Sequence, residues 1–537
     1  MKTKHLSFLQ LLLPIAILLS AIVTWRVTGT LMDSDAASEL VLSHHLSENG
    51  GILSSDWIYS TELRVANTQL VFAPLFLLFN DWHMVRFLGA MILQLLLVGS
   101  FYLFIRLMGA DRRIFHIGAP LMLLPISVCY GRIVLYHSFY VPHIALSFLL
   151  VGLIFHFFKS GPKRNLATAL KLLLLMGLSL IGGLGGVRQL MITHLPALLA
   201  IGVCCFLEDR TDPKGSIRKR TRLIPLGIAL ASAVFSYLGL LINTNVLAEQ
   251  YTYMDYSEKL LDFFDFSRFG KLLYGFFHHF GFRAEGKLIS LVGALSMLGF
   301  FLGLYALIRS VRHILNHKGD VRQTALRGFL IFHLIVMMMV FFFTTENYYH
   351  VLYLIFVLCW AIPLLITELL EAPNHLSPLN LRRLLPYAAV VLLAVNGIVN
   401  ILYLCNDDLF EQRYEGLTAQ NKQQMQQIEP AATYLEAEGY DLGYATFWNS
   451  NVMTELSNGA IRTVNLRQNQ TTGQLYYYDW LTLRSNRTLT DAKRFLLLQQ
   501  SERPLFESTG RAEGLTVLYE DDYYIAYDLP APERILG

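Results

Sequence analysis

The sequence consists largely of long apolar segments that alternate with short charged loops. Hydrophobic residues make up 54% of the 537 residues and charged residues only 15%, against roughly 25% in soluble domains. Many apolar segments reach the length of about 20 residues that crosses a bilayer as a helix. The pattern therefore predicts a polytopic α-helical membrane protein and excludes a large soluble enzyme.

Eleven segments are apolar and long enough to be predicted as membrane spans. A further apolar segment, 66–80, is shorter and contains Pro74, which favours a re-entrant or interfacial helix. The predicted spans are 7–25, 84–108, 114–131, 138–158, 166–184, 189–207, 223–242, 287–308, 325–344, 349–367 and 384–403.

The distribution of basic residues predicts the orientation. If 66–80 does not cross, the strongly basic loops share the side of Lys2 and Lys4, as the positive-inside rule requires of the cytoplasmic side. The first span lacks a small-residue cleavage site, so we expect a retained anchor rather than a signal peptide. We therefore expect a plasma (inner) membrane protein with a cytoplasmic N-terminus. The basic loops are Arg112-Arg113, 159–164, 210–222, 309–327 and Arg382-Arg383.

The C-terminal part differs from the rest in charge and periodicity. From residue 404 onward, 19 acidic residues face 11 basic ones, a net charge of −8 that leaves +11 for the preceding part. We therefore divide the chain into a transmembrane domain, 1–403, and a soluble extracytoplasmic α/β domain, 404–537. A helix is predicted over 418–438 and strands over 443–447, 460–464, 515–519 and 523–527, the last two as a hairpin. The five cysteines show neither a disulfide framework nor metal-type spacing.

Three carboxylates follow the first span in the first extracytoplasmic loop, 26–83. Asp33, Asp35 and Glu39 begin an amphipathic helical segment that Gly50 is expected to end. On one interpretation, Asp35 or Ser34 only caps this helix. On another, an acid at the membrane boundary removes a proton from an acceptor hydroxyl. Asp33 and Asp35 could instead hold a divalent cation, which leaves the metal question open.

Arg188 is the candidate for binding a phosphate group outside the cytoplasm. It follows a glycine-rich break, Gly182-Gly183-Leu-Gly185-Gly186-Val, and glycine allows close approach of backbone to a ligand. Arginine matches phosphate oxygens bidentately. The competing interpretation is an interfacial arginine whose side chain reaches lipid headgroups. Lys271, in the aromatic loop 243–286, is a second candidate for a phosphate contact.

The order of these elements resembles the GT-C superfamily of membrane glycosyltransferases, which includes protein O-mannosyltransferases and the aminoarabinose transferases of lipid A. The similar features are Asp33 after the first span, Glu39, Asp56-Trp57, and a short apolar helix that ends near Pro74-Leu75. The resemblance implies an inverting transfer from a polyprenyl-phosphate sugar to an extracytoplasmic glycan, lipid or protein. Asp33 would then be the general base, and Asp35 or Glu39 its partner.

Two places depart from the pattern of that superfamily. The loop after the third span lacks the second acid found in several members, and His137, Tyr140 and His143 occupy its neighbourhood. The tenth span begins near Glu346, Tyr348 and Tyr349, where many relatives have Arg-Tyr. We predict that these six residues, with Asp56 and Trp57, contact substrate.

Two other functions are compatible with parts of the sequence. A flippase or transporter of lipid-linked glycans would need polar residues at the bilayer midplane, often in paired repeats, but here the acids lie at one edge. A non-catalytic scaffold that presents the C-terminal domain would leave the acids and Arg188 unexplained. The expected partners are thus a polyprenyl-phosphate-linked sugar, its acceptor and membrane lipids, but no nucleic acid.

Overall fold

The computed structural model describes residues 2–61, 63, 65–160, 164–211, 219–253, 268–283, 289–316, 321–343, 351–371, 381–406 and 417–537. The chain forms two compact units. The first, here called the helical unit, comprises residues 1–24, 93–244 and 257–413. The second, here called the sheet unit, comprises residues 25–92, 245–256 and 414–537.

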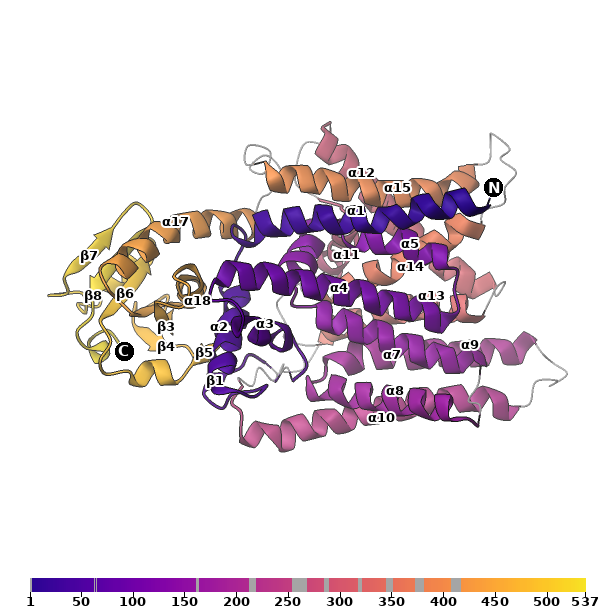
Figure 1. Cartoon of the computed structure of the whole chain (residues 1–537), viewed down its shortest axis with the longest axis horizontal. Coiled ribbons are helices and arrows are strands. Elements are labelled where there is room, and N and C mark those ends of the chain that lie inside the picture. Colours follow the sequence, from indigo (N-terminus) through magenta and orange to yellow (C-terminus); the bar gives the residue numbers. More distant parts are fainter. Residues whose placement is uncertain are drawn as a thin grey trace. The chain divides into compact units, whose positions relative to one another are not determined.

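The helical unit is a bundle of apolar helices, and Figure 1 shows its long helices with nearly parallel axes. In the described residues, eight helices are long and apolar enough to cross a membrane, two of which (α1 and α4) continue into the sheet unit. This confirms a polytopic α-helical membrane protein. The helices are α1 (Lys2–Thr28), α4 (Trp82–Met108), α5 (Arg112–Met122), α6 (Val128–Tyr130), α7 (Val141–Ser160), α8 (Leu166–Leu184), α9 (Leu195–Thr211), α10 (Lys219–Asn245), α11 (Arg268–His279), α12 (Leu291–Asn316), α13 (Val321–Phe343), α14 (Ile355–Glu371) and α15 (Leu381–Cys405), with π-helices η1 (Gly131–Tyr136) and η2 (Leu190–His194) and the 3₁₀-helix η4 (Val351–Leu354).

Three of the eleven predicted spans are not formed by one long α-helix in the described residues. The segment 114–131 contains α5, which ends at Met122, shortly before Pro125. A proline disfavours helical backbone at the residue before it, which accounts for the break. The other two segments begin with η2 and η4 and continue as α9 and α14, which have 17 residues each.

Polar side chains and glycines inside the helical unit join neighbouring helices. Gln94 accepts a hydrogen bond from Ser20 at 2.8 Å and donates to Thr24 at 2.9 Å, which joins α4 to α1. A Cβ atom on Gly183 of α8 would lie 1.8 Å from the backbone oxygen of Ser236 in α10. Small residues that let two backbones approach are a common means of packing helices in membranes.

The sheet unit combines the first loop with the C-terminal domain. A six-stranded sheet has the order β4-β3-β2-β6-β8-β7, in which β2 runs parallel to β3 and β6 and the other pairs are antiparallel. Its elements are α2 (Ser34–Asn49), β1 (Trp57–Ile58), α3 (Gln69–Phe76), η3 (Leu247–Glu249), α17 (Leu417–Ala437), β2 (Leu442–Thr446), α18 (Phe447–Leu456), β3 (Arg462–Gln468), β4 (Leu475–Tyr477), β5 (Thr482–Leu483), η5 (Ser485–Thr488), β6 (Arg494–Gln499), α19 (Arg503–Glu507), β7 (Val517–Glu520), β8 (Tyr524–Asp528) and η6 (Pro532–Arg534).

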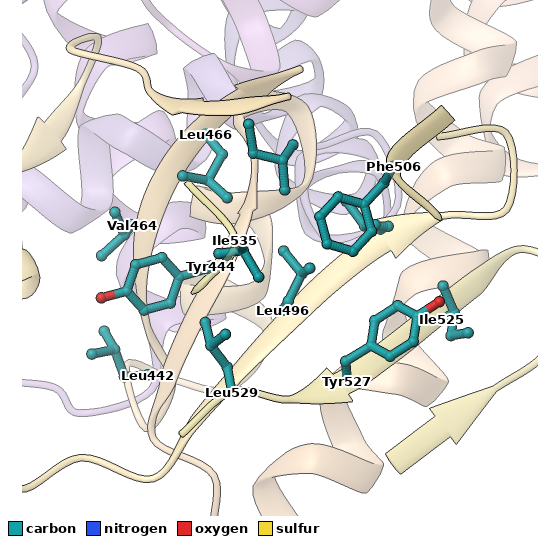
Figure 2. Close-up of a cluster of buried hydrophobic side chains, with 12 residues drawn as sticks. Leu442, Tyr444, Val464, Leu466, Leu496, Phe506, Ile525, Tyr527, Leu529 and Ile535 are labelled. Atoms are coloured by element: carbon teal, nitrogen blue, oxygen red, sulfur yellow. The ribbon is translucent and has the colours of Figure 1, made fainter. Parts of the chain in front are cut away.

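The core of the C-terminal domain lies on one face of this sheet. Alternate residues of each strand point to that face, and Figure 2 shows Leu442 and Tyr444 of β2 beside Val464 and Leu466 of β3. Leu496, Phe506 and Tyr527 extend the cluster across the sheet. On β3, the side chain of Thr463 bonds to Thr454 of α18.

The elements predicted for the C-terminal domain are confirmed. The helix over 418–438 is α17, and the four predicted strands correspond to β2, β3, β7 and β8, with the last two paired antiparallel. The segment 66–80 contains α3, whose 8 residues rise only about 12 Å. The domain boundary at residue 404 stays a prediction. The structure adds that 25–92 and 245–256 pack with 414–537.

Candidate active site

Asp33 begins α2 and is almost completely buried. Its side chain is 2% exposed, and Oδ1 accepts a hydrogen bond from the backbone N–H of Ala36 at 2.9 Å. Asp33 is therefore the N-cap of α2, which corrects the interpretation that Ser34 or Asp35 caps this helix. Asp35 lies in the first turn and is half-buried. The helix ends as predicted, because Gly50 adopts a positive φ of 76° and its N–H bonds to Leu46 O at 2.8 Å.

Glu39 lies one turn further along α2 and connects it to α3. Its buried carboxylate accepts a hydrogen bond from the hydroxyl of Thr68, the residue before α3. The same residue accepts a bond from Ser43 Oγ through its backbone oxygen, at 2.6 Å. Glu39 therefore fixes the short apolar helix against the helix that carries Asp33.

Asp56 and Trp57 connect the first loop to the C-terminal domain. The Asp56 carboxylate accepts bonds from Ser485 N at 2.9 Å and Ser485 Oγ at 2.5 Å. Trp57 is 1% exposed and pairs with Leu483 in the two-stranded antiparallel sheet of β1 and β5. Both residues thus hold together parts of the chain more than 400 positions apart.

Arg86, in the second turn of α4, is a buried cation that the sequence prediction missed. Its guanidinium forms two hydrogen bonds with the carboxylate of Glu455 in α18 and donates to Ala36 O at 2.9 Å. Arg86 and Glu455 are 1% and 6% exposed. Burial raises the pKa of the Glu455 carboxyl, the charge of Arg86 opposes this shift, and the nearby Asp33 adds to it. An arginine inside an apolar span was the available signal, because such residues are rarely incidental.

The pair between Arg86 and Glu455 ties α18 to the start of α2. Helix α18 packs directly against α2. The next residues also contact α4, because Asn458 Oδ1 accepts a bond from Trp82 N at 3.0 Å. The C-terminal domain therefore contributes to holding the helix that Asp33 caps.

Arg188 lies in the helical unit, between α8 and η2, where three side chains hold it. Its Nη1 donates to His143 Nε2 at 3.1 Å, so His143 accepts as a neutral imidazole. The guanidinium carbon lies 5.3 Å from the ring centroid of Tyr140 and 5.5 Å from that of Tyr353. The structure thus brings together three candidates from the sequence analysis, Arg188, His143 and Tyr140. The sequence analysis missed Tyr353.

The glycines before Arg188 have different roles. Gly183 permits the contact with α10 described above, so its small size serves helix packing. Gly186 has a φ of 98°, a conformation that glycine adopts readily, and it allows the chain to leave α8 before Arg188. Gln189 continues this link, because its Nε2 donates to His143 O at 3.0 Å.

The remaining predicted residues lie on other elements or outside the described part of the chain. His137 is buried at the end of η1, where its N–H bonds to Arg132 O at 2.8 Å. Lys271 is an exposed residue of α11. Glu346, Tyr348 and Tyr349 lie outside the described residues. Among the described residues, no group of three His, Cys, Asp or Glu side chains could hold a metal ion.

No family model matches the chain, and no curated protein matches its sequence. Its structure is similar to that of ArnT from Cupriavidus metallidurans bound to undecaprenyl phosphate, with a TM-score of 0.50 and 10% identity. The similarity covers 97% of this chain and 98% of ArnT.

An oligosaccharyltransferase from Archaeoglobus fulgidus is also similar, at 12% identity. Its structure tethered to an acceptor peptide with an NVT sequon gives a TM-score of 0.47, covering 97% of this chain and 74% of that protein. Its apo form gives 0.45, with coverage of 99% and 75%. The likeness to ArnT extends over both units of the chain described above. The chain therefore has the GT-C fold predicted from its first loop, with a C-terminal domain that contains a sheet.

Proposed function

We propose that this protein is a membrane glycosyltransferase that moves a sugar from a polyprenyl-phosphate donor to an acceptor outside the cytoplasm. The observation that carries the proposal is the position of Asp33, a buried carboxylate directly after the first span, in a chain with the fold of ArnT. That relative was solved with undecaprenyl phosphate bound. The proposal includes the location predicted from the basic loops, with the protein in the plasma (inner) membrane and its N-terminus in the cytoplasm.

Asp33 is the proposed general base of an inverting transfer. As the acceptor hydroxyl oxygen attacks the anomeric carbon, its proton passes to the Asp33 carboxylate, and the bond between that carbon and the phosphate oxygen breaks. The hydrogen bond from Ala36 N to Oδ1 supports this role because it fixes the orientation of the carboxylate. Asp35 and Glu39 are its proposed partners on α2. In this proposal, Glu39 acts through its hydrogen bond with Thr68.

Arg188 is the proposed binding residue for the phosphate of the donor. An arginine presents a planar fork of N–H donors that matches phosphate oxygens. The ring faces of Tyr140 and Tyr353 and the imidazole of His143 orient this group, and its positive charge can stabilise the charge that develops on the leaving phosphate. Lys271 is proposed as a second phosphate contact, and Tyr140 and His143 as substrate neighbours through Arg188.

The remaining substrate contacts are proposals from the sequence. They comprise His137 at the end of η1, the Asp56-Trp57 pair, and the residues Glu346, Tyr348 and Tyr349 at the predicted start of the tenth span. The contacts of Asp56 with Ser485 favour an indirect role for this residue, in which it holds the first loop in place.

Replacing Asp33 by asparagine tests the base. Asparagine caps helices about as well as aspartate, so Asp33→Asn should leave α2 intact while it removes the proton acceptor. We expect the transfer rate to fall about 10²- to 10⁴-fold, the usual contribution of a general base. The measurement is sugar transfer by the purified full chain in vesicles that contain polyprenyl-phosphate sugars.

Asp81→Asn is the matched control, because Asp81 is also an aspartate that caps a helix, through Met84 N at 3.2 Å, but it is exposed. It should retain full transfer. Full transfer by the Asp33→Asn protein would refute the base assignment.

Mass spectrometry of a deletion strain identifies the sugar. Loss of one envelope sugar with accumulation of its lipid carrier supports a transferase, whereas an unchanged, cytosol-facing glycolipid would indicate a flippase.

A further inference from the structure

A cavity in the helical unit is lined by residues of three helices and contains none of the residues of the two clusters described above. It has a volume of about 560 Å³, within the range of about 300–1,000 Å³ that is usual for ligand pockets. Residues of α1, α4 and α5, and of the turn between the last two, line it. The lining residues are Gln10, Tyr102, Ile105, Arg106, Gly109, Ala110, Arg112, Phe115 and His116.

The charge of this cavity is positive. Arg106 is the third residue from the end of α4, and Arg112 is the first residue of α5. The neighbouring acid, Asp111, is occupied by Arg113, whose Nη2 lies 2.6 Å from its Oδ2. Within the described part of the chain, no carboxylate forms an ion pair with Arg106 or Arg112. Two guanidinium groups are therefore available for one anionic ligand.

The contact that orients Arg106 leaves its charge in place. Its Nη1 donates to the hydroxyl of Tyr102 at 3.2 Å, and its guanidinium carbon lies 5.9 Å from the centroid of that ring. A tyrosine positions an arginine in this way without neutralising it. The two arginines approach the cavity from different helices, which gives a phosphate group donors on two sides.

The level of the cavity in the membrane and the exposed apolar side chains beside it favour an amphiphilic anion over a free phosphate ion. Arg106 lies two residues before the end of a predicted span, or about 3 Å along the helix axis, which is the level of lipid headgroups. Leu11 and Leu103, next in sequence to lining residues, are 58% and 48% exposed and lie on spans. An amphiphile can cover such side chains with its acyl chains, whereas a free phosphate ion cannot.

We propose that this cavity binds the phosphate headgroup of an anionic phospholipid, with Arg106 and Arg112 as its ligands. The acyl chains lie along the exposed apolar side chains of α1 and α4. Basic pockets between helices on the side that carries the positive loops attract anionic lipids. The site is independent of the proposed sugar transfer and needs no sugar donor.

The experiment is native mass spectrometry of the full chain in non-ionic detergent. The protein is titrated with phosphatidylglycerol or with phosphatidylcholine of the same acyl chains. We expect phosphatidylglycerol to bind at least about tenfold more tightly, and the double variant Arg106→Gln/Arg112→Gln to lose this preference. Hydrogen bonds from charged groups are strong enough for about a tenfold effect.

Arg113→Gln is the matched control, because this arginine lies in the same turn but is paired with Asp111. It should keep the preference, and so should Arg106→Lys/Arg112→Lys, which retains both charges. Equal binding of the two lipids by the unaltered protein would overturn the proposal. So would an equal loss in the Arg113→Gln protein, or displacement of the lipid by millimolar inorganic phosphate, which would identify a site for the free ion.

Discussion

Arg86 and Arg188 are both arginines on apolar helices or next to them, but their surroundings differ. In the sheet unit, Arg86 is buried and forms two hydrogen bonds with the Glu455 carboxylate. In the helical unit, Arg188 is half-buried, contacts the faces of Tyr140 and Tyr353, and donates to His143. The Glu455 carboxylate balances the charge of Arg86, which suits a structural role. The rings and the imidazole that contact Arg188 carry no negative charge and orient its guanidinium, in keeping with the ligand role proposed above.

The largest expected effect comes from breaking the ion pair in the sheet unit. Glu455→Gln leaves Arg86 buried and charged without its carboxylate, a change that costs about 3–5 kcal/mol in comparable pairs. We expect a corresponding loss in the free energy of unfolding. The measurement is denaturant or thermal unfolding of the full chain in detergent micelles.

Two further variants sharpen this prediction. Arg86→Met/Glu455→Leu removes both charges, and replacing a whole buried pair by apolar residues is often close to neutral. It should recover most of the stability lost in the Glu455→Gln protein. Glu436→Gln, at an exposed position of α17, should change stability by less than about 0.5 kcal/mol. A cost for Glu455→Gln as small as that of this control would contradict a structural ion pair.

The counterpart in the helical unit is Arg188→Ala, which tests the ligand role. Given the proposed function, we expect the apparent KM for the polyprenyl-phosphate donor to rise about ten- to hundredfold, because hydrogen bonds to charged groups contribute about 1.5–3 kcal/mol. The donor KM of the Arg188→Lys protein should lie between those of the unaltered protein and the alanine variant, because lysine keeps the charge but loses the planar fork. An unchanged donor KM in the alanine variant would show that another cation binds the phosphate.

A smaller effect is expected from removing one of the rings that orient Arg188. Tyr353→Leu removes a cation–π contact worth about 0.5–2 kcal/mol and should raise the donor KM several-fold. Tyr353→Phe keeps the ring face and should leave KM unchanged. If the phenylalanine variant were as impaired as the leucine variant, the hydroxyl and not the ring face would be the important group.

The smallest effect is expected for a third arginine, Arg503, whose side chain is more exposed to solvent than that of Arg86. Arg503 pairs with Glu507 at 2.7 Å and with Glu520 at 2.6 Å, and all three side chains are accessible to water. Such pairs contribute about 0.2–1 kcal/mol each, so Arg503→Gln should reduce the stability of the sheet unit by no more than this amount per pair. Urea unfolding at neutral pH measures the difference.

The pH dependence of that difference follows from the pKa of Glu507. Hydrogen bonds from Arg503, and then from Tyr527, lower the pKa of this carboxyl. Its contribution to stability is therefore present above the unfolded-state pKa of about 4.3 and is lost as the pH falls through the lowered folded-state value. The difference in the free energy of unfolding between the unaltered protein and the Arg503→Gln protein should thus disappear in acid. A difference that stays constant in acid would mean that Arg503 acts through packing.

The sequence predicted those features that depend on local pattern. Apolar length predicted the spans, and Gly50 was recognised as the end of α2 because only a positive φ closes the helix there. Asp33 was chosen as an acid directly after a span and Arg188 as an arginine after a glycine-rich break, whereas Tyr140 and His143 were chosen because they lie where several members of the superfamily have an acid. The roles of these four residues stay predictions. The identity of the cap was missed, because Ser34, Asp35 and Asp33 are all good capping residues and only the backbone geometry distinguishes them.

Features that depend on distant contacts could not be predicted. Arg86 and Glu455 are 369 positions apart, so the place of Arg86 in an apolar span signals a buried cation but does not tell which acid pairs with it. Gly183 was interpreted as leaving space for a ligand, although its neighbour is the backbone of α10. Nothing in a single sequence tells which of two surfaces a glycine will face.

The contact between Asp56 and Ser485 has a consequence for the synthesis of the chain. The two residues are separated by 429 positions, and β1 pairs with β5 beside them. At about 5–20 residues per second, the ribosome needs roughly 20 to 90 s after Asp56 emerges before its partner exists. During that interval α2 lacks the α18 surface on which it packs. A nascent chain, or one that terminates before α18, would thus carry its acidic loop without the surface on which α2 packs.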